Sequence, residues 1–124
     1  MSNVEIIEYV ETREELFRDY YAKAKALIHP AEKDAVGFVV VEALASSTPV
    51  LASAGVGGSD YLPETWRVTT NRVEEWVQKV EALSDGDVRV AEKTFEQENL
   101  NIESPYFREI AKKISTFLTK RGWL

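Results

Sequence analysis

The chain has 124 residues, enough for one domain whose core buries roughly two thirds of the surface that the unfolded chain exposes. Its apolar content of 44% and charged content of 29% are typical of a globular protein, and charges interrupt every apolar run before the ~20 residues of a membrane span. Because there is no cysteine and only one histidine, His29, disulfides, thiol catalysis and an ordinary zinc site are excluded, and we expect no bound metal.

The net charge of −6 is unevenly distributed. Residues 106–124 contain five Lys or Arg and one Glu, a net +4, so the preceding 105 residues carry −10. An acidic body would repel a phosphate backbone, which argues against nucleic-acid binding. The N-terminal residues are acidic and resemble a strand, unlike a signal peptide, so we expect a cytoplasmic protein.

Short apolar runs alternate with longer amphipathic ones. The apolar runs predict strands near residues 4–9, 25–29, 49–53 and 66–69. Between the first two strands, a helix is predicted to start with Thr12 and Glu15 as a capping box. Its apolar face would consist of Leu16, Tyr20 and Ala24.

The segment 37–45 is ambiguous by local rules. Its three consecutive valines, 39–41, favour a strand, whereas the Glu-Ala-Leu-Ala that follows favours a helix. A right-handed crossover between the parallel strands at 25–29 and 49–53 requires a helix at this point. We therefore predict a helix, from whose second turn Glu42 points sideways.

Further amphipathic runs predict helices at 71–83, with Asn71 as N-cap, and at 88–99. A basic amphipathic C-terminal helix is expected at about 105–121, opened by Pro105. The alternation of strands and helices predicts an α/β fold over residues 1–124, a small parallel Rossmann-like sheet flanked by helices.

In such sheets, ligands bind outside the carboxyl ends of the strands. One loop that leaves these ends runs into the helix starting near Gly37, where a glycine would let a phosphate approach the backbone amides of Phe38 and Val39. One and a half turns later, Glu42 would accept hydrogen bonds from a pair of hydroxyls such as those of a ribose. The pattern thus indicates a site for a nucleotide diphosphate linked to a sugar.

Several spaced residues together resemble the donor-binding motif of retaining, family 4 type (group 1) glycosyltransferases. They are Pro30, Asp34, Gly37, Glu42-Ala43, Pro49-Val50 and Gly57-Gly58. The family has two Rossmann-like domains in the GT-B arrangement. The resemblance implies that the chain is the C-terminal, donor-binding domain, truncated at its N-terminal side.

The resemblance also implies roles for these residues. Glu42 would hold the nucleotide ribose, and the amides of Phe38 and Val39 the distal phosphate. Asp34 would contact the transferred sugar as the catalytic carboxylate. The Pro30 turn and the Gly57-Gly58 loop would line the site. The implied activity moves a sugar from a nucleotide diphosphate sugar to an acceptor with retention, without a cofactor or metal.

The chain also departs from the family pattern. The departures are Asp34 for a Glu, Ala31 for a Ser, Ser47 for a Gly and Tyr61 for a Glu. The family's donor domain also begins with two further strands and an Arg–Lys pair that holds the diphosphate. We therefore expect the chain to be inactive alone, and to self-associate or to need a partner chain that supplies the missing strands.

Other interpretations remain open at this point. Glu42 would serve equally as a buried acid bonded within the protein. The whole chain would then be a non-catalytic Rossmann-like module kept for nucleotide binding or protein association, or an unrelated flavodoxin-like or receiver-like module. The basic C-terminal helix would either pack on protein or contact an anionic membrane surface; packing is the commoner role of such a helix.

Overall fold

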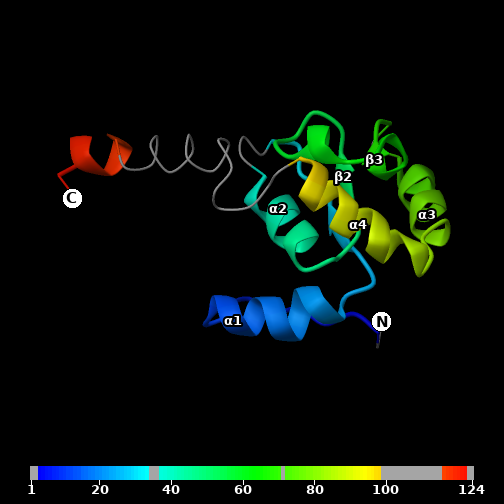
Figure 1. The fold of residues 1–124 in the computed structure, drawn as a ribbon, viewed down its shortest axis with the longest axis horizontal. Coiled ribbons are helices and arrows are strands. Elements are labelled where there is room, and N and C mark those ends of the chain that lie inside the picture. Colours follow the sequence, from blue (N-terminus) through cyan, green and yellow to red (C-terminus); the bar gives the residue numbers. More distant parts are fainter. Residues whose placement is uncertain (1–2, 34–36, 71, 99–115, 123–124) are drawn as a thin grey trace.

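The structure is a computed structural model that describes residues 3–33, 37–70, 72–98 and 116–122. Three short strands form a parallel sheet in the order β1-β2-β3 (Figure 1). Their bounds are Leu27–His29 for β1, Val50–Ser53 for β2 and Arg67–Val68 for β3. Ile28 of β1 pairs with Leu51, and Ala52 pairs with Arg67 of β3. The predicted α/β class with a small parallel sheet is confirmed.

Helices connect the strands and cover the sheet. The crossover from β1 to β2 contains α2, Phe38–Ala45, so the ambiguous segment is a helix as the topology requires. After β3 come α3, Val73–Glu81, and α4, Gly86–Gln97. In the view of Figure 1, α2 and α3 lie to either side of the strands, and α4 packs against α2.

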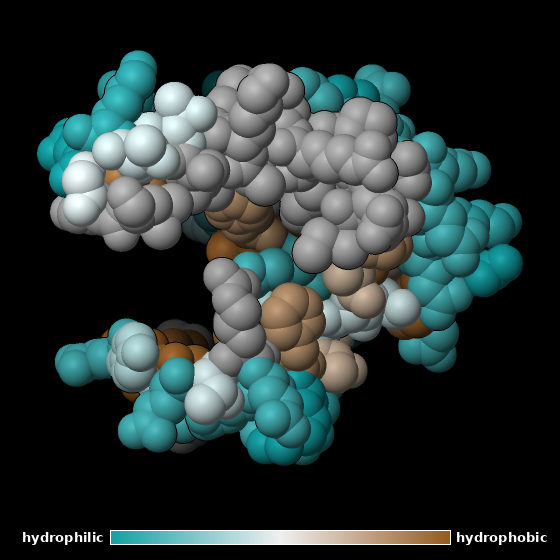
Figure 2. All heavy atoms as spheres, turned by 60° about the vertical axis from the view of Figure 1, so that its left-hand side comes forward, coloured by the Kyte–Doolittle hydropathy of each residue, from teal (hydrophilic) through white to brown (hydrophobic). Residues whose placement is uncertain are grey.

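The core is centred on β2 and α2. Val50, Leu51 and Ala52 are all fully buried, which explains the uninterrupted apolar run of this strand, because a central parallel strand is covered on both faces. Val40 and Leu44 of α2 are equally buried and pack against them. Figure 2 shows that hydrophobic side chains also reach the surface of one face of the molecule, among hydrophilic ones.

The predicted strand at residues 4–9 is wrong. These residues form no strand, and Ile6 and Tyr9 are 87% and 78% exposed. The preference of such residues for strands reflects packing against a neighbouring strand. Among the described residues, β1 pairs only with β2, so this segment has no ladder to join.

The predicted apolar stripe of the first helix, Leu16, Tyr20 and Ala24, lines one apolar groove but is not buried in the core. The Thr12 hydroxyl accepts the Glu15 backbone N–H at 3.0 Å, as a capping box requires. The helix then changes geometry: α1, Arg13–Glu15, runs into a π-helical turn, η1, Leu16–Tyr20, and a 3₁₀ turn, η2, Tyr21–Lys23.

In the π-turn, the Tyr21 N–H donates to the carbonyls of Leu16 and Phe17. Residues five apart therefore share a face, so Tyr21 is buried while Tyr20 and Ala24 point to solvent. The predicted face of Leu16, Tyr20 and Ala24 assumed a regular α-helical period, which this segment does not have.

Two further predictions fall partly outside the described residues. Asn71, the expected N-cap of α3, lies outside them. Most of the C-terminal helix expected at about 105–121 does too; residues 116–120 are helical, and the Arg121 guanidinium lies 4.9 Å from the centre of the Phe117 ring.

Candidate functional site

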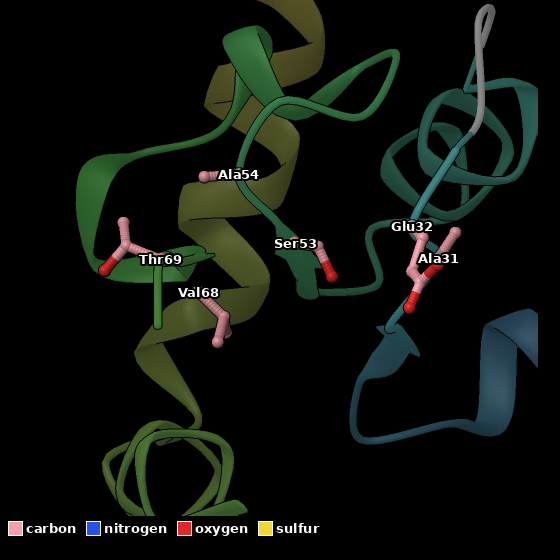
Figure 3. Close-up of a pocket in the computed structure, with 6 residues that line it drawn as sticks. All are labelled: Ala31, Glu32, Ser53, Ala54, Val68 and Thr69. Carbon is pink, nitrogen blue, oxygen red and sulfur yellow. The ribbon is translucent and has the colours of Figure 1, made fainter. Parts of the chain in front are cut away.

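A pocket lies at the carboxyl ends of the three strands (Figure 3). It has a volume of about 210 Å³. Each strand contributes two lining residues at or just after its carboxyl end: Ala31 and Glu32 after β1, Ser53 and Ala54 at β2, and Val68 and Thr69 at β3. This is the edge of the sheet at which the fold class places a ligand. Its polar side chains are one carboxylate and two hydroxyls, and none of these lining residues is basic.

Glu75, in the first turn of α3, forms hydrogen bonds to the loop after β3, which is one wall of this pocket. Its carboxylate accepts the backbone N–H of Thr69 at 2.8 Å, the Thr70 hydroxyl at 2.7 Å and the Thr70 N–H at 3.0 Å. These hydrogen bonds, with that of the Thr69 N–H foremost, lower the pKa of Glu75 to about 2 because they favour the ionised form. The carboxylate therefore fixes the conformation of the loop between β3 and α3.

The two glycine segments meet at the start of α2. Gly37 is the N-cap residue with φ of +72°, and a Cβ built on it would lie 1.9 Å from the Gly57 carbonyl oxygen. Gly58 has φ of +87°, and a Cβ there would lie 3.1 Å from the Cβ of Val40. The structure thus brings together Gly37, Gly57 and Gly58, which the sequence analysis assigned to one site. The space on the Cβ side of Gly37 holds the Gly57 backbone, so loop packing is itself a reason for a glycine here.

The first amides of α2 lie at the same end. The helical hydrogen bonds begin with the N–H groups of Val40 and Val41, which both donate to the Gly37 carbonyl, at 3.1 and 3.3 Å. The amides of Phe38 and Val39 precede these bonds, as expected for a helix N-terminus, whose partial positive charge favours an anion. Phe38 is 39% exposed and Val39 is half-buried.

Glu42 has a partner within the protein. It is half-buried, and its Oε2 accepts the Tyr21 hydroxyl at 3.1 Å. Its own backbone carbonyl accepts the Ser46 hydroxyl at 3.0 Å. Of the other predicted site residues, Pro30 follows β1 and is exposed, whereas Asp34 lies outside the described residues.

Tyr21 was not predicted from the sequence as part of this region. It is 8% exposed, and its ring lies 5.5 Å from that of Phe17. Its backbone carbonyl accepts the buried Thr48 hydroxyl at 2.6 Å. The sequence holds no signal for Tyr21, because its burial depends on the π-turn. Glu75 had a signal: two threonines shortly before a helix with acids in its first turn.

No group of three His, Asp or Glu residues able to hold a metal ion occurs in the part of the chain that the structure describes. Within the same residues, no helix is long and apolar enough to span a bilayer.

Comparison with known proteins gives one match. The family model described as "Glycosyl transferases group 1" matches residues 2–99, a span that includes all three strands, α2 and both glycine segments. No curated protein and no solved structure gives a significant match.

Proposed function

Since the chain belongs to the group 1 glycosyltransferase family, we propose that it is the donor-binding part of a glycosyltransferase that takes a sugar from a nucleotide diphosphate sugar. The observation that carries this proposal is the family match over residues 2–99, a span that includes the β1–α2–β2 unit. We also propose that the transfer goes to an acceptor with retention of configuration, and that the enzyme has the GT-B arrangement.

We assign the roles as the resemblance implies them. Glu42 would accept hydrogen bonds from the ribose hydroxyls. The amides of Phe38 and Val39, at the positive end of α2, would bind the distal phosphate. Asp34 would contact the transferred sugar. The support for this assignment is that Glu42 and the two amides project from consecutive turns of one short helix.

The chemistry follows from these groups. We predict that the site binds no metal. The departing diphosphate would then be stabilised by backbone amides and the dipole of α2. The transition state of sugar transfer is oxocarbenium-like, and a nearby carboxylate would stabilise its positive charge. None of the residues assigned to the site is a Lys or Arg that could complete this stabilisation. We therefore expect the 124-residue chain to bind a donor and to transfer no sugar at a useful rate without an added partner.

Titration with UDP, GDP, ADP and CDP, followed by heat release, tests the proposal. Binding of one of them with micromolar affinity would support it, and the nucleotide bound would identify the base. If all four fail to bind, the donor-binding role is wrong.

The second candidate function is a non-catalytic Rossmann-like module. It is favoured by the fact that two motif residues have partners inside the protein: Gly37 packs on Gly57, and Glu42 accepts a hydrogen bond from Tyr21. Such a module would keep these residues for stability alone. A module kept for protein association would bind none of the nucleotides, and Glu42→Gln would then change only the free energy of unfolding.

We also propose that the chain self-associates through the outer edge of β1. Leu27 donates its N–H to Pro49 on the β2 side, so the N–H and C=O of Ile28 point to the other edge, where no described strand pairs. An apolar groove of about 510 Å³ lies beside this edge, between Ile7 and Leu27.

The occupant that fits this edge is the segment 4–9 of a second copy. That segment has strand-forming residues and two acids, Glu5 and Glu8, whereas the exposed Lys23 and Lys25 both precede β1. The opposite charges would favour the pairing. Contact of the C-terminal helix with a membrane and a cytoplasmic location stay predictions.

A further inference from the structure

The hydroxyl of Tyr21 contacts a residue of the proposed nucleotide site without belonging to that site's motif. It donates to Oε2 of Glu42 at 3.1 Å, across 21 positions of sequence. We propose that Tyr21 is a positioning residue, which orients the Glu42 carboxylate for the ribose hydroxyls; this inference rests on the proposed function.

Several contacts together fix the position of Tyr21. The π-helical turn of η1 puts it on the buried face, where its ring packs against Phe17. Its carbonyl accepts the Thr48 hydroxyl at 2.6 Å, and Thr48 lies just before β2 and is 2% exposed. A side chain held at both its backbone and its ring offers its hydroxyl in one direction. Single π-turns within helices occur frequently at functional sites.

The length of this hydrogen bond favours a role in orienting the Glu42 carboxylate over a role in neutralising its charge. An O–H···O⁻ bond between strongly interacting groups measures 2.5–2.7 Å, and this one is longer, at 3.1 Å. The hydrogen bond from the Tyr21 hydroxyl limits the rotation of the Glu42 carboxylate. Pre-orientation of this kind raises affinity because less side-chain freedom is lost on binding.

The test compares Tyr21→Phe with Tyr20→Phe in nucleoside diphosphate titrations. Both variants remove one hydroxyl from neighbouring tyrosines of the same segment, but Tyr20 is 36% exposed and lines the groove beside β1. We expect Tyr21→Phe to weaken binding about two- to tenfold, the effect of one hydrogen bond, and Tyr20→Phe to leave it unchanged.

A double-mutant cycle separates positioning from a general structural effect. In a Glu42→Ala background, Tyr21→Phe should have less effect on nucleotide affinity than in the wild type, because the side chain it orients is gone. A purely structural Tyr21 would weaken binding by the same factor in both backgrounds, which would overturn the inference.

The outcomes distinguish the two levels of proposal. If Glu42→Gln weakens binding while Tyr21→Phe behaves like Tyr20→Phe, the inference is wrong and the proposed function stands. If no nucleoside diphosphate binds, or Glu42→Gln has no effect, the ribose role fails and the inference fails with it.

Should Tyr21→Phe not fold, ring-labelled tyrosine in the wild-type chain provides a second measurement. The signal of Tyr21, assigned by elimination with Phe variants of the other four tyrosines, should shift when the nucleotide binds. A signal that does not move at saturating nucleotide would contradict the inference.

Discussion

A Cβ added to Gly37 would lie 1.9 Å from the carbonyl oxygen of Gly57, so two loops twenty residues apart in sequence are in direct backbone contact. This contact joins the start of α2 to the segment after β2. It holds the two sides of the proposed donor site together without any side chain between them.

Gly37→Ala should therefore be strongly destabilising. The methyl group would collide with the Gly57 backbone, and φ of +72° is itself unfavourable for alanine. We expect a loss of about 2–5 kcal/mol in the free energy of unfolding, combining ~1–2 for the backbone and ~1–3 for overpacking. Urea denaturation followed by circular dichroism measures it.

Gly55→Ala is the matched control, because Gly55 has φ of +89° but nothing within 4 Å of an added Cβ. It should lose only the backbone part, ~1–2 kcal/mol. Equal losses at Gly37 and Gly55 would show that the contact with Gly57 is less tight than described.

Glu42→Gln should weaken nucleotide binding by about 1.5–3 kcal/mol, the value of a hydrogen bond to a charged group. Folding stability should change little, since glutamine keeps an oxygen that can accept the Tyr21 hydroxyl. Calorimetric titration and thermal melting give the two quantities, with the exposed Glu81→Gln as control. A large drop in melting temperature with unchanged affinity would identify Glu42 as a structural acid.

Glu75 should make the stability of the chain depend on pH in a defined window. Its folded pKa of about 2 lies below the ordinary value of 4.5, so its stabilising contribution is complete above pH 4.5 and is lost as the pH falls toward 2. Glu75→Gln should therefore be less stable than the wild type at pH 7, and the difference should shrink between pH 4.5 and 2.

Urea midpoints measured across this range test the prediction. Glu74→Gln, the exposed neighbour on the same turn, serves as control. A difference between wild type and Glu75→Gln that stays constant from pH 5 to pH 2 would mean that the hydrogen bonds to Thr69 and Thr70 do not favour the ionised carboxylate.

Ile28→Glu should reduce self-association. Ile28 is 48% exposed at the outer edge of β1, and a glutamate there would repel the acidic segment 4–9 of a second copy, which carries Glu5 and Glu8. Sedimentation velocity at micromolar concentration should show a dimer for the wild type and a monomer for the variant. Val73→Glu, on the 72% exposed first residue of α3, should leave the dimer intact.

A wild-type monomer at these concentrations would contradict the edge-pairing proposal. So would a monomer in which residues 4–9 pair with β1 of their own chain, which hydrogen exchange of the Ile28 amide would reveal as protection without association.

The sequence by itself determined the parallel strands near residues 27, 50 and 67 and the helix between the first two, because apolar runs and the handedness of the crossover leave few alternatives. It also carried the spacing from Gly37 through Glu42 to Gly57-Gly58, from which the family was correctly inferred. Only the tertiary structure decided the rest. Residues 4–9 lack a strand because pairing needs a neighbour, which local preference does not supply. Tyr21 replaces Tyr20 in the core because a π-turn shifts the helical period by one residue, and the hydrogen bond to Glu42 that follows joins side chains 21 positions apart, which no local pattern encodes.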